Sequence, residues 1–390
     1  GGRSVVLKNV PSRTMQDMKF PDAPYGMKMA CGENPKRVYG KKGGPMTRMG
    51  NVKGYRQAWS DAQNYMREWE KYEADYEAGK NPKAPKRNLD LETMAGVLSG
   101  DIRVHMHCYR ADEMTVMMDM MKEFDYQIAA FHHAVEGYKI ADKLAENNVC
   151  ASMWADWWGF KLEAYDGIRE NIPVVHAANA CAIVHSDDEL GIQRLNQEAA
   201  KAWSDGKRAS IDISMEEAWQ WLSANPAKSL GIFDKTGSIE AGKNADLVLW
   251  TGNPFSTYTK AEQVFVDGGK AYELGNPESW PLSDFEVGQV GDVQGPGHHV
   301  GQPDADHDGI VIGTQTMGKG ARRSACDPFA VTTLGGDAAV KGGCGFQSKK
   351  RAAFGNAHNK TGVEIAGVVL AKACFGLNAG FAQAPDSGAG

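Results

Sequence analysis

Short apolar segments alternate with helical segments through the first 225 residues, and this alternation constrains the fold more than any other feature of the sequence. Apolar runs predict strands at 25–31, 102–107, 127–131 and 149–154, and two shorter apolar segments lie at 174–178 and 182–185. Helical spacing predicts helices at 53–78, 89–98, 111–124, 136–147, 163–170, 196–205 and 214–225. Strands that alternate with helices indicate parallel β-α-β units and the α/β class. Because no Gly-rich nucleotide-binding motif follows these strands, we expect a TIM-like (β/α)8 barrel rather than a doubly wound sheet.

Composition divides the chain into three regions. Residues 1–225 contain the alternating pattern of the barrel, and residues 226–290 have the strand and turn pattern of a small β-sandwich domain. Residues 291–390 are rich in Gly, Ala and Asp and show little periodicity, so we expect this tail to be disordered or an assembly artefact. Its last part has the basic start, apolar middle and A-Q-A of a signal peptide, which would act only at an N-terminus.

The charge balance argues against two classes of partner. A formal net charge of −6 and a pI of about 6.0 give no basic face for nucleic acid or an anionic membrane. The sequence contains no run of 18 apolar residues, so we expect no membrane-spanning helix. The seven cysteines form no C-x-x-C pair, so we expect most of them to be buried free thiols. The sequence leaves open the compartment, cytoplasmic or periplasmic and secreted, and whether the chain forms a homo-oligomer.

Histidines gather near the ends of the apolar segments. Six of the ten are placed in this way, namely His105, His107, His132, His133, His176 and His185. Asp187 and Asp188 follow directly after the last of them. A barrel brings strand ends together around one axis, where neutral imidazoles and a carboxylate form the nitrogen and oxygen ligands of a zinc-type site. A single histidine at a strand end is more often a packed residue, but the repeated pattern predicts a shared metal site.

Two clusters of large side chains have simpler interpretations. The Met-rich run at 113–124 and the aromatic side chains of 53–78 are expected to be packing faces of outer helices. Trp154, Trp157 and Trp158 follow a predicted strand together with Lys161 and Glu163. This position after a strand end would let them line the mouth of a pocket.

The chain resembles the amidohydrolase superfamily, specifically its imidazolonepropionase-like and Xaa-Pro dipeptidase-like branch. The resemblance covers residues 1 to about 290 and rests on GENPKRVYG (32–40), HMHCYRADEM (105–114), FHHAVEGYKIAD (131–142), MWADWWGFKLEAYDGI (153–168), VHSDDELGIQRLNQEAAKA (184–202) and WLSANPAKSLGIFDKTGSIEAGKNADLVLWTGNPF (221–255). It implies hydrolysis of an amide, cyclic amide or dipeptide by metal-bound hydroxide, with one or two zinc ions. The expected partner is therefore a small-molecule amide or peptide substrate.

The resemblance also implies a set of metal ligands. His105 is similar to the fifth-strand ligand of the superfamily, His133 to the sixth-strand ligand and Asp187 to the eighth-strand ligand. Lys28 resembles the fourth-strand lysine, which can be carboxylated to bridge two metals, and Glu33 is the alternative bridging residue. The two alternatives are equally open at this point.

The chain departs from the superfamily pattern at its beginning. No His-x-His motif precedes residue 28, so we expect a barrel that is incomplete at its first strands and truncated at the N-terminus. His298-His299 and Asp306-His307-Asp308 in the tail do not reproduce that motif. The expected metal site therefore lacks two of the family's ligands.

The remaining roles follow from position. The resemblance implies that Asp187 binds metal and transfers a proton from water to the leaving nitrogen. His107 and His132 lie beside ligands and are candidates for catalysis, whereas Arg37, Tyr39 and Trp154 are candidates for substrate binding. Two alternatives to the C–N hydrolase remain: an inactive, metal-deficient fragment or binding protein on the same scaffold, and a metal-dependent deaminase.

Overall fold

The computed structural model describes residues 2–188 and 191–280, and a six-stranded sheet forms the centre of this part. The strands are β1 (Arg3–Ser4), β2 (Tyr25–Ala30), β3 (Ile102–Cys108), β4 (Ile128–His133), β5 (Cys150–Met153) and β6 (Ala182–Val184). They lie side by side in sequence order, β1 antiparallel to β2 and all later neighbours parallel. The carboxyl ends of β2 to β6 therefore share one edge of the sheet.

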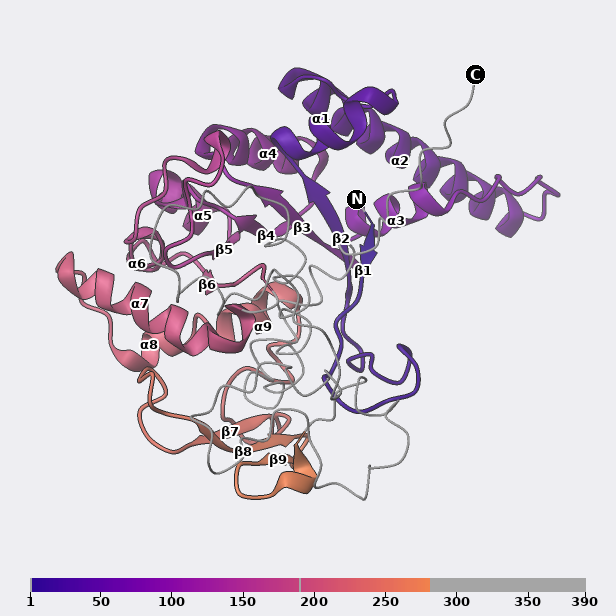
Figure 1. The fold of residues 1–390 in the computed structure, drawn as a ribbon. Coiled ribbons are helices and arrows are strands. Elements are labelled where there is room, and N and C mark those ends of the chain that lie inside the picture. The colour runs from indigo at the N-terminus through magenta and orange to yellow at the C-terminus, as the bar shows by residue number, and fades with distance from the viewer. Residues whose placement is uncertain (1, 189–190, 281–390) are drawn as a thin grey trace, which may run out of the picture.

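Helices connect the parallel strands along the outside of the sheet (Figure 1). After β2 come α1 (Glu33–Tyr39), α2 (Arg48–Glu77) and α3 (Leu89–Leu98), and α4 (Ala111–Phe124) follows β3. The later helices are α5 (Ala141–Glu146), α6 (Asn171–Ala177), α7 (Leu195–Arg208), α8 (Met215–Trp219) and α9 (Ala224–Leu230). Short 3-10 turns lie at Gly40–Lys42, Gly137–Ile140, Leu162–Ala164, Gly191–Arg194 and Pro277–Ser279.

Burial explains why these strands occupy the centre. Every residue of β4 and β5 is buried, and only one residue of β3 is not, as expected for parallel strands covered by helices. The Met-rich face of α4 packs into the main core through Met114, Met117, Met118, Met120 and Met121. The prediction that this run is a packing face is confirmed.

Local side-chain chemistry sets the start of several helices. The Thr47 side chain accepts a hydrogen bond from the backbone of Gly50 at the start of α2, and Asn88 caps α3 in the same way. Ser214 and Glu217 form a reciprocal capping box at α8. The aromatic side chains of α2 reach the core where Trp59 is fully buried, its ring centroid 4.4 Å from that of Tyr126.

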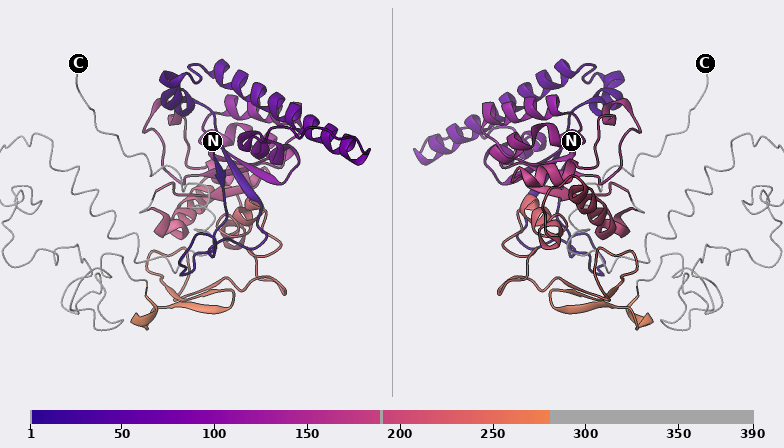
Figure 2. Two further views of the ribbon diagram at one scale, coloured as in Figure 1. Left: turned by 90° about the vertical axis from the view of Figure 1, so that its right-hand side faces the viewer. Right: turned by 90° about the vertical axis from the view of Figure 1, so that its left-hand side faces the viewer.

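A second sheet lies apart from the first. It consists of three antiparallel strands, β7 (Leu247–Trp250), β8 (Ala261–Val266) and β9 (Gly269–Glu273). The two views in Figure 2, each turned by 90° from Figure 1, show it at the opposite end of the molecule from α1 and α2. The strand and turn pattern predicted after residue 226 therefore forms an antiparallel sheet, although α9 extends four residues beyond that boundary.

The α/β class and the parallel sheet are confirmed, with qualifications to the predicted elements. In the described part of the chain the sheet runs from β1 to β6, with no pairing that joins these two edges into a closed barrel. The segment 174–178 forms the end of α6 and its C-cap, so the prediction that His176 lies near a strand end was wrong. The helix predicted at 163–170 is only a 3-10 turn, and the one at 214–225 is divided into α8 and the start of α9. The tail at 291–390 lies outside the described residues.

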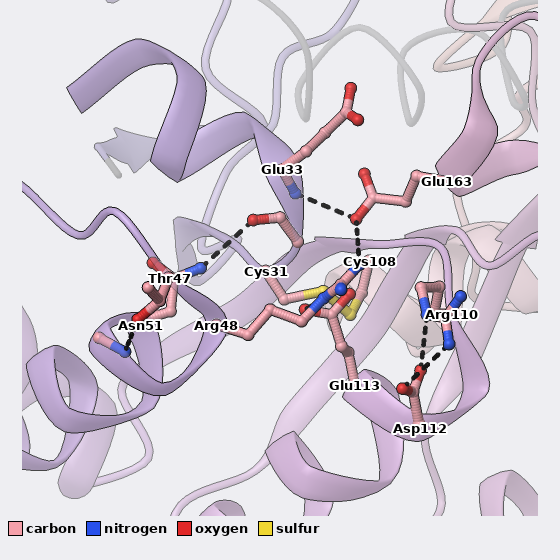
Figure 3. Close-up of polar contacts among 12 residues, drawn as sticks. Cys31, Glu33, Thr47, Arg48, Asn51, Cys108, Arg110, Asp112, Glu113 and Glu163 are labelled. Carbon is pink, nitrogen blue, oxygen red and sulfur yellow. Dashed lines mark hydrogen bonds and ion pairs between the residues drawn. A yellow bond between two sulfur atoms is a disulfide. The ribbon is translucent and has the colours of Figure 1, made fainter. Parts of the chain in front are cut away.

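Four of the cysteines are disulfide-bonded, which corrects the prediction of free thiols. Cys31 pairs with Cys108 and Cys150 pairs with Cys181. Each disulfide joins neighbouring parallel strands, and Figure 3 shows the Cys31–Cys108 bond beside Arg48. Cys108 follows His107, which pairs with Ala30 across the sheet, so strand register places its thiol opposite that of Cys31. Spacing along the chain does not reveal such a register.

No helix in residues 2–188 and 191–280 is both long and apolar enough to cross a membrane.

Candidate metal centre

Five buried histidines converge at the carboxyl edge of the parallel strands. They come from β3, from β4 and from the segment after β6, namely His105, His107, His132, His133 and His185. Register aligns the two histidine pairs, because His107 is opposite His132 on the neighbouring strand. Parallel strands end at the same edge, so residues 80 positions apart in the sequence come together.

The histidines form two contact groups. His105 Nδ1 lies 3.2 Å from His132 Nε2. In the other group, the His133 ring centroid is 4.6 Å from that of His107 and 5.1 Å from that of His185. The second group also contains Asp187, whose Oδ2 is 3.6 Å from His133 Nδ1. The structure therefore brings His133 and Asp187 together, as predicted, and adds His107 and His185 to them.

Burial keeps these imidazoles neutral. It lowers the pKa of His105, His107 and His185 to about 3, and it lowers the pKa of His132 and His133 well below the ordinary value of 6.5. A nearby positive charge on Lys28 acts in the same direction on all five. Neutral imidazole is the form of histidine that donates a lone pair to a metal.

Position favours Lys28 over Glu33 as the residue at the centre of the site. Lys28 lies on β2 opposite His105, and its charge also lowers the pKa of Asp187. Glu33 begins α1 instead, and its Oε1 lies 3.2 Å from Lys161 Nζ. Of the two bridging candidates, Lys28 is therefore the one whose charge acts on the histidines.

The side chain of Asp187 is 31% exposed, and its carboxyl has a raised pKa. Desolvation is the largest cause and raises the pKa of this carboxyl to about 6, with a smaller contribution from the charge of Asp188. The positive charges of Lys28 and Lys161 oppose this shift. A carboxyl with a pKa near 6 can both accept and release a proton close to neutral pH.

The backbone adopts uncommon conformations at two of these residues. His133 has φ of 75° and Asp187 has φ of 50°, in the left-handed region that non-glycine residues rarely occupy. Each such residue costs on the order of 1 kcal/mol or more, and such strain is concentrated at functional sites. The strained backbone therefore marks the ends of β4 and β6 independently of their side-chain chemistry.

Aromatic rings form one wall of the site. Trp154 stacks on His133 with ring centroids 4.7 Å apart, and its Nε1 donates a hydrogen bond to the Ser186 carbonyl. Tyr109 stacks on the same histidine at 5.2 Å and meets His107 edge-on at 4.8 Å. Trp154, predicted to line the pocket, thus lies against His133, and its role in substrate binding stays a prediction.

The other predicted residues lie farther from the histidines. Arg37 and Tyr39 are on α1, where both are exposed, and the charge of Arg37 acts on Tyr109. His176 is half-buried on α6, where its Nδ1 accepts a hydrogen bond from Trp221 Nε1. A structural role explains His176 fully.

The chemical types of these side chains fit a divalent metal, whereas their positions in the structure do not form a complete set of ligands. Buried neutral imidazoles and a carboxylate are the ligands that zinc prefers. Within residues 2–188 and 191–280, however, no three His, Cys, Asp or Glu side chains are arranged so that they could hold a metal ion. The chemistry of a metal site is therefore present, and its full ligand geometry is not.

A separate cavity of about 670 Å³ lies between α2 and α4. Its lining includes Arg48, Val52, Glu113 and Met117, and it includes none of the five site histidines. The perturbed and converging side chains lie outside this cavity, at the strand ends.

Two residues at the site, Asn34 and Tyr109, were not predicted from the sequence, and His185 was part of the histidine pattern without an individual ligand role. Asn34 Nδ2 lies 3.0 Å from His107 Nε2, the Tyr109 ring meets His107 edge-on, and His185 contacts His133. Tyr109 directly follows the HMHC motif, and His185 belonged to the histidine pattern that predicted the shared metal site. These two signals were present in the sequence, but the position of Asn34 depends on how α1 leaves the sheet.

Comparison with known proteins identifies relatives for most of the described chain. The family model described as Amidohydrolase family matches residues 26–272. The amidohydrolase tasK of Hapsidospora irregularis is 30% identical over 256 residues, which are 63% of this chain and 26% of that protein. Probable allantoinase 2 of Dictyostelium discoideum is 36% identical over 63 residues, 16% of this chain and 12% of the relative. The chain thus spans about a quarter or less of these curated relatives.

A solved structure of similar fold is the amidohydrolase from Thermotoga maritima MSB8. It is 32% identical to this chain, with a TM-score of 0.59, and the match covers 67% of this chain and 66% of that one.

Proposed function

The chain belongs to the amidohydrolase family, and we propose that it hydrolyses a C–N bond of a small amide, a cyclic amide or a dipeptide. Metal binding is typical of this family, and we propose zinc as the metal. The observation that carries the proposal is the convergence of buried, neutral histidines on a carboxyl with a pKa of about 6. Such perturbed groups in one place are characteristic of catalytic sites.

The proposed ligands are those that the sequence suggested, namely His105, His133, Asp187, Lys28 and, as an alternative to Lys28, Glu33. The contacts support His133, Asp187 and Lys28 most directly. Two histidines of β3 are available as the next ligand, and His107 is the one whose ring contacts His133. A bound divalent metal would supply Lewis acidity, which activates water and polarises the amide carbonyl.

The protein's own groups would handle the proton and the substrate. Asp187 would take a proton from the attacking water and transfer it to the leaving nitrogen, as its raised pKa permits. His132 and His107 would act on the carbonyl oxygen as hydrogen-bond donors, each with its second ring nitrogen held by a neighbour, His105 or Asn34. Trp154 and Tyr109 would exclude water from one side of the site.

One observation favours a second candidate, a metal-deficient protein that binds ligands on the same scaffold. No three potential ligands in the described residues are placed to hold a metal ion. Under this alternative the histidine cluster would remain neutral and packed, and the carboxyl of Asp187 would have no catalytic partner.

Metal content decides between these candidates. The purified protein would be stripped with a chelator, reloaded with zinc, separated from free metal and measured by elemental analysis. We expect one to two zinc ions per chain, a loss of zinc in His133→Ala and no loss in the matched variant His176→Ala, whose histidine lies on α6. Two zinc ions would support a bridging Lys28, whereas the absence of zinc in the wild type would refute the proposal.

Activity provides the direct test. The zinc-loaded chain would be incubated with N-acyl amino acids, dipeptides and a cyclic amide, and the release of amine or carboxylate would be followed. Cleavage that disappears in Asp187→Asn but persists in His176→Ala would support the proposed roles. Bound zinc without cleavage of any C–N substrate would refute the activity while leaving the metal site standing.

A further inference from the structure

Lys161 lies in the segment that connects β5 to α6 over the histidine cluster. Its side chain is only 20% exposed, and its Nζ lies 4.1 Å from the centroid of the Tyr109 ring. A cation at this distance over an aromatic face is held by the ring's electron density. The lysine is thus fixed in place and does not extend freely into solvent.

Tyr109 connects this lysine to the site. The same ring stacks on His133 and meets His107 edge-on. Lys161 therefore lies on a ring that is itself in contact with two of the site histidines. A substrate held with its scissile bond beside Asp187 would therefore extend toward this cation.

Glu163 determines where the segment lies. This carboxylate is buried, and its Oε1 accepts a hydrogen bond of 3.0 Å from the backbone of Glu33 (Figure 3). Gly32 leaves room for it, since a Cβ at that position would collide with the carboxylate. Arg48 adds a cation 3.8 Å from the same oxygen, and Lys161 Nζ is 3.7 Å from Oε2. Glu163 therefore ties the segment that carries Lys161 to the loop after β2.

The second partner of Lys161 is more exposed. Glu33 Oε1 lies 3.2 Å from Lys161 Nζ, and the Glu33 side chain is 36% exposed. An exposed ion pair of this kind contributes little to stability because water competes with it. A carboxylate from a ligand can therefore replace Glu33 at Lys161 without disturbing the buried Glu163.

We propose that Lys161 determines substrate specificity by binding a free carboxylate of the substrate, which replaces Glu33 as its partner. The substrate class is then an amide that bears a carboxylate near the scissile bond, such as an N-acyl amino acid or a dipeptide. This inference rests on the proposed C–N hydrolase function and narrows it, since neutral cyclic amides lack the group that Lys161 recognises.

The test compares two ligands that differ only in this charge. Binding of N-acetyl-L-leucine and of N-acetyl-L-leucinamide to the zinc-loaded full chain would be measured by calorimetry at low and high salt. We expect the carboxylate to bind roughly tenfold more tightly or better, as a charge-assisted hydrogen bond provides. Salt should weaken the carboxylate ligand more than the neutral one.

Variants separate recognition from folding. Lys161→Met should remove the preference, and Lys161→Arg should retain it, because only the charge is required. Lys139→Met is the matched control: Lys139 also lies near two carboxylates, Asp166 at 2.8 Å and Glu136 at 3.4 Å, but its ring contact is Tyr138. The control should keep the wild-type preference.

Each outcome bears on the inference separately from the reaction. Equal binding of the two ligands by the wild type, binding of neither, or an undiminished preference in Lys161→Met would overturn it. A carboxylate preference that depends on Lys161, in a chain that cleaves no amide, would support the inference as a binding property and refute the hydrolase. Cleavage of amides without a carboxylate preference would support the hydrolase and refute the inference about Lys161.

Discussion

Acid should unfold the metal-free protein at a pH where most globular proteins are stable. The perturbation is a decrease in pH from 7 to 5.5 in the presence of a chelator. The five site histidines are buried and keep a pKa well below 5.5 while the protein is folded. After unfolding they regain a pKa of about 6.5 and bind protons, so acid favours the unfolded state.

The magnitude follows from proton linkage. A histidine with a lowered folded pKa contributes stability that is complete above the unfolded pKa and is lost as pH falls. Between pH 7 and 5.5 each histidine should lose ~1.2 kcal/mol, or ~6 kcal/mol for all five. Asp187 acts in the opposite direction, because its pKa of about 6 makes the folded state hold a proton that the unfolded state releases. It should offset ~1 kcal/mol, which leaves a loss of ~5 kcal/mol, comparable to the whole stability of many domains.

Urea denaturation followed by tryptophan fluorescence would measure this loss at several pH values. A single variant, His105→Gln, should reduce it by ~1.2 kcal/mol because one titrating group is removed. His176→Gln should reduce it less, since that ring is only half-buried. A wild-type loss below ~2 kcal/mol would mean that the cluster titrates in the folded state, and the buried neutral site would be refuted.

Three further predictions concern catalysis, the disulfides and the core. Asp187→Asn should lower kcat by about 100-fold or more if this carboxyl transfers the proton, and an unchanged kcat in steady-state assays would exclude that role. Cys108→Ser and Cys181→Ser, which open disulfides across 77 and 31 positions, should each lower the free energy of unfolding by about 4 kcal/mol. The reduced wild-type protein is the control for both variants in urea denaturation. Equal stability of the wild type with and without reductant would show that neither disulfide forms. Leu144→Ala should cost about 2–5 kcal/mol because its fully buried side chain leaves a cavity, and a cost below 1 kcal/mol would show that α5 is loosely packed.

Long periodic segments were predicted well. The helices at Leu89–Leu98 and Ala111–Phe124 have the predicted bounds, and α2 begins five residues earlier than expected. Their apolar spacing repeats over several turns, so local pattern and tertiary packing agree. Short segments were predicted poorly: 174–178 is mostly apolar because α6 is largely buried, and a five-residue segment has no period that distinguishes a strand from a helix.

Part of the candidate site could also be predicted. Histidines near the ends of successive apolar segments indicated a shared centre, and the structure brings five of those six together with Asp187 or with one another. The sixth, His176, lies on α6. The choice between Lys28 and Glu33 needed the structure, because Lys28 lies in the same short strand that Glu33 follows. Only strand register shows that Lys28 lies opposite His105, and only the path of α1 turns Glu33 toward Lys161.

The sequence by itself determined the α/β class, the family and the strand ends that carry the chemistry, because strand and helix periods and histidine positions are local properties. The tertiary structure alone decided which side chains meet. The disulfide between Cys31 and Cys108, the rings that enclose His133 and the position of Lys161 over Tyr109 all depend on contacts between segments far apart in the chain. Such contacts follow from strand register and loop path, which side-chain packing fixes and residue spacing does not record.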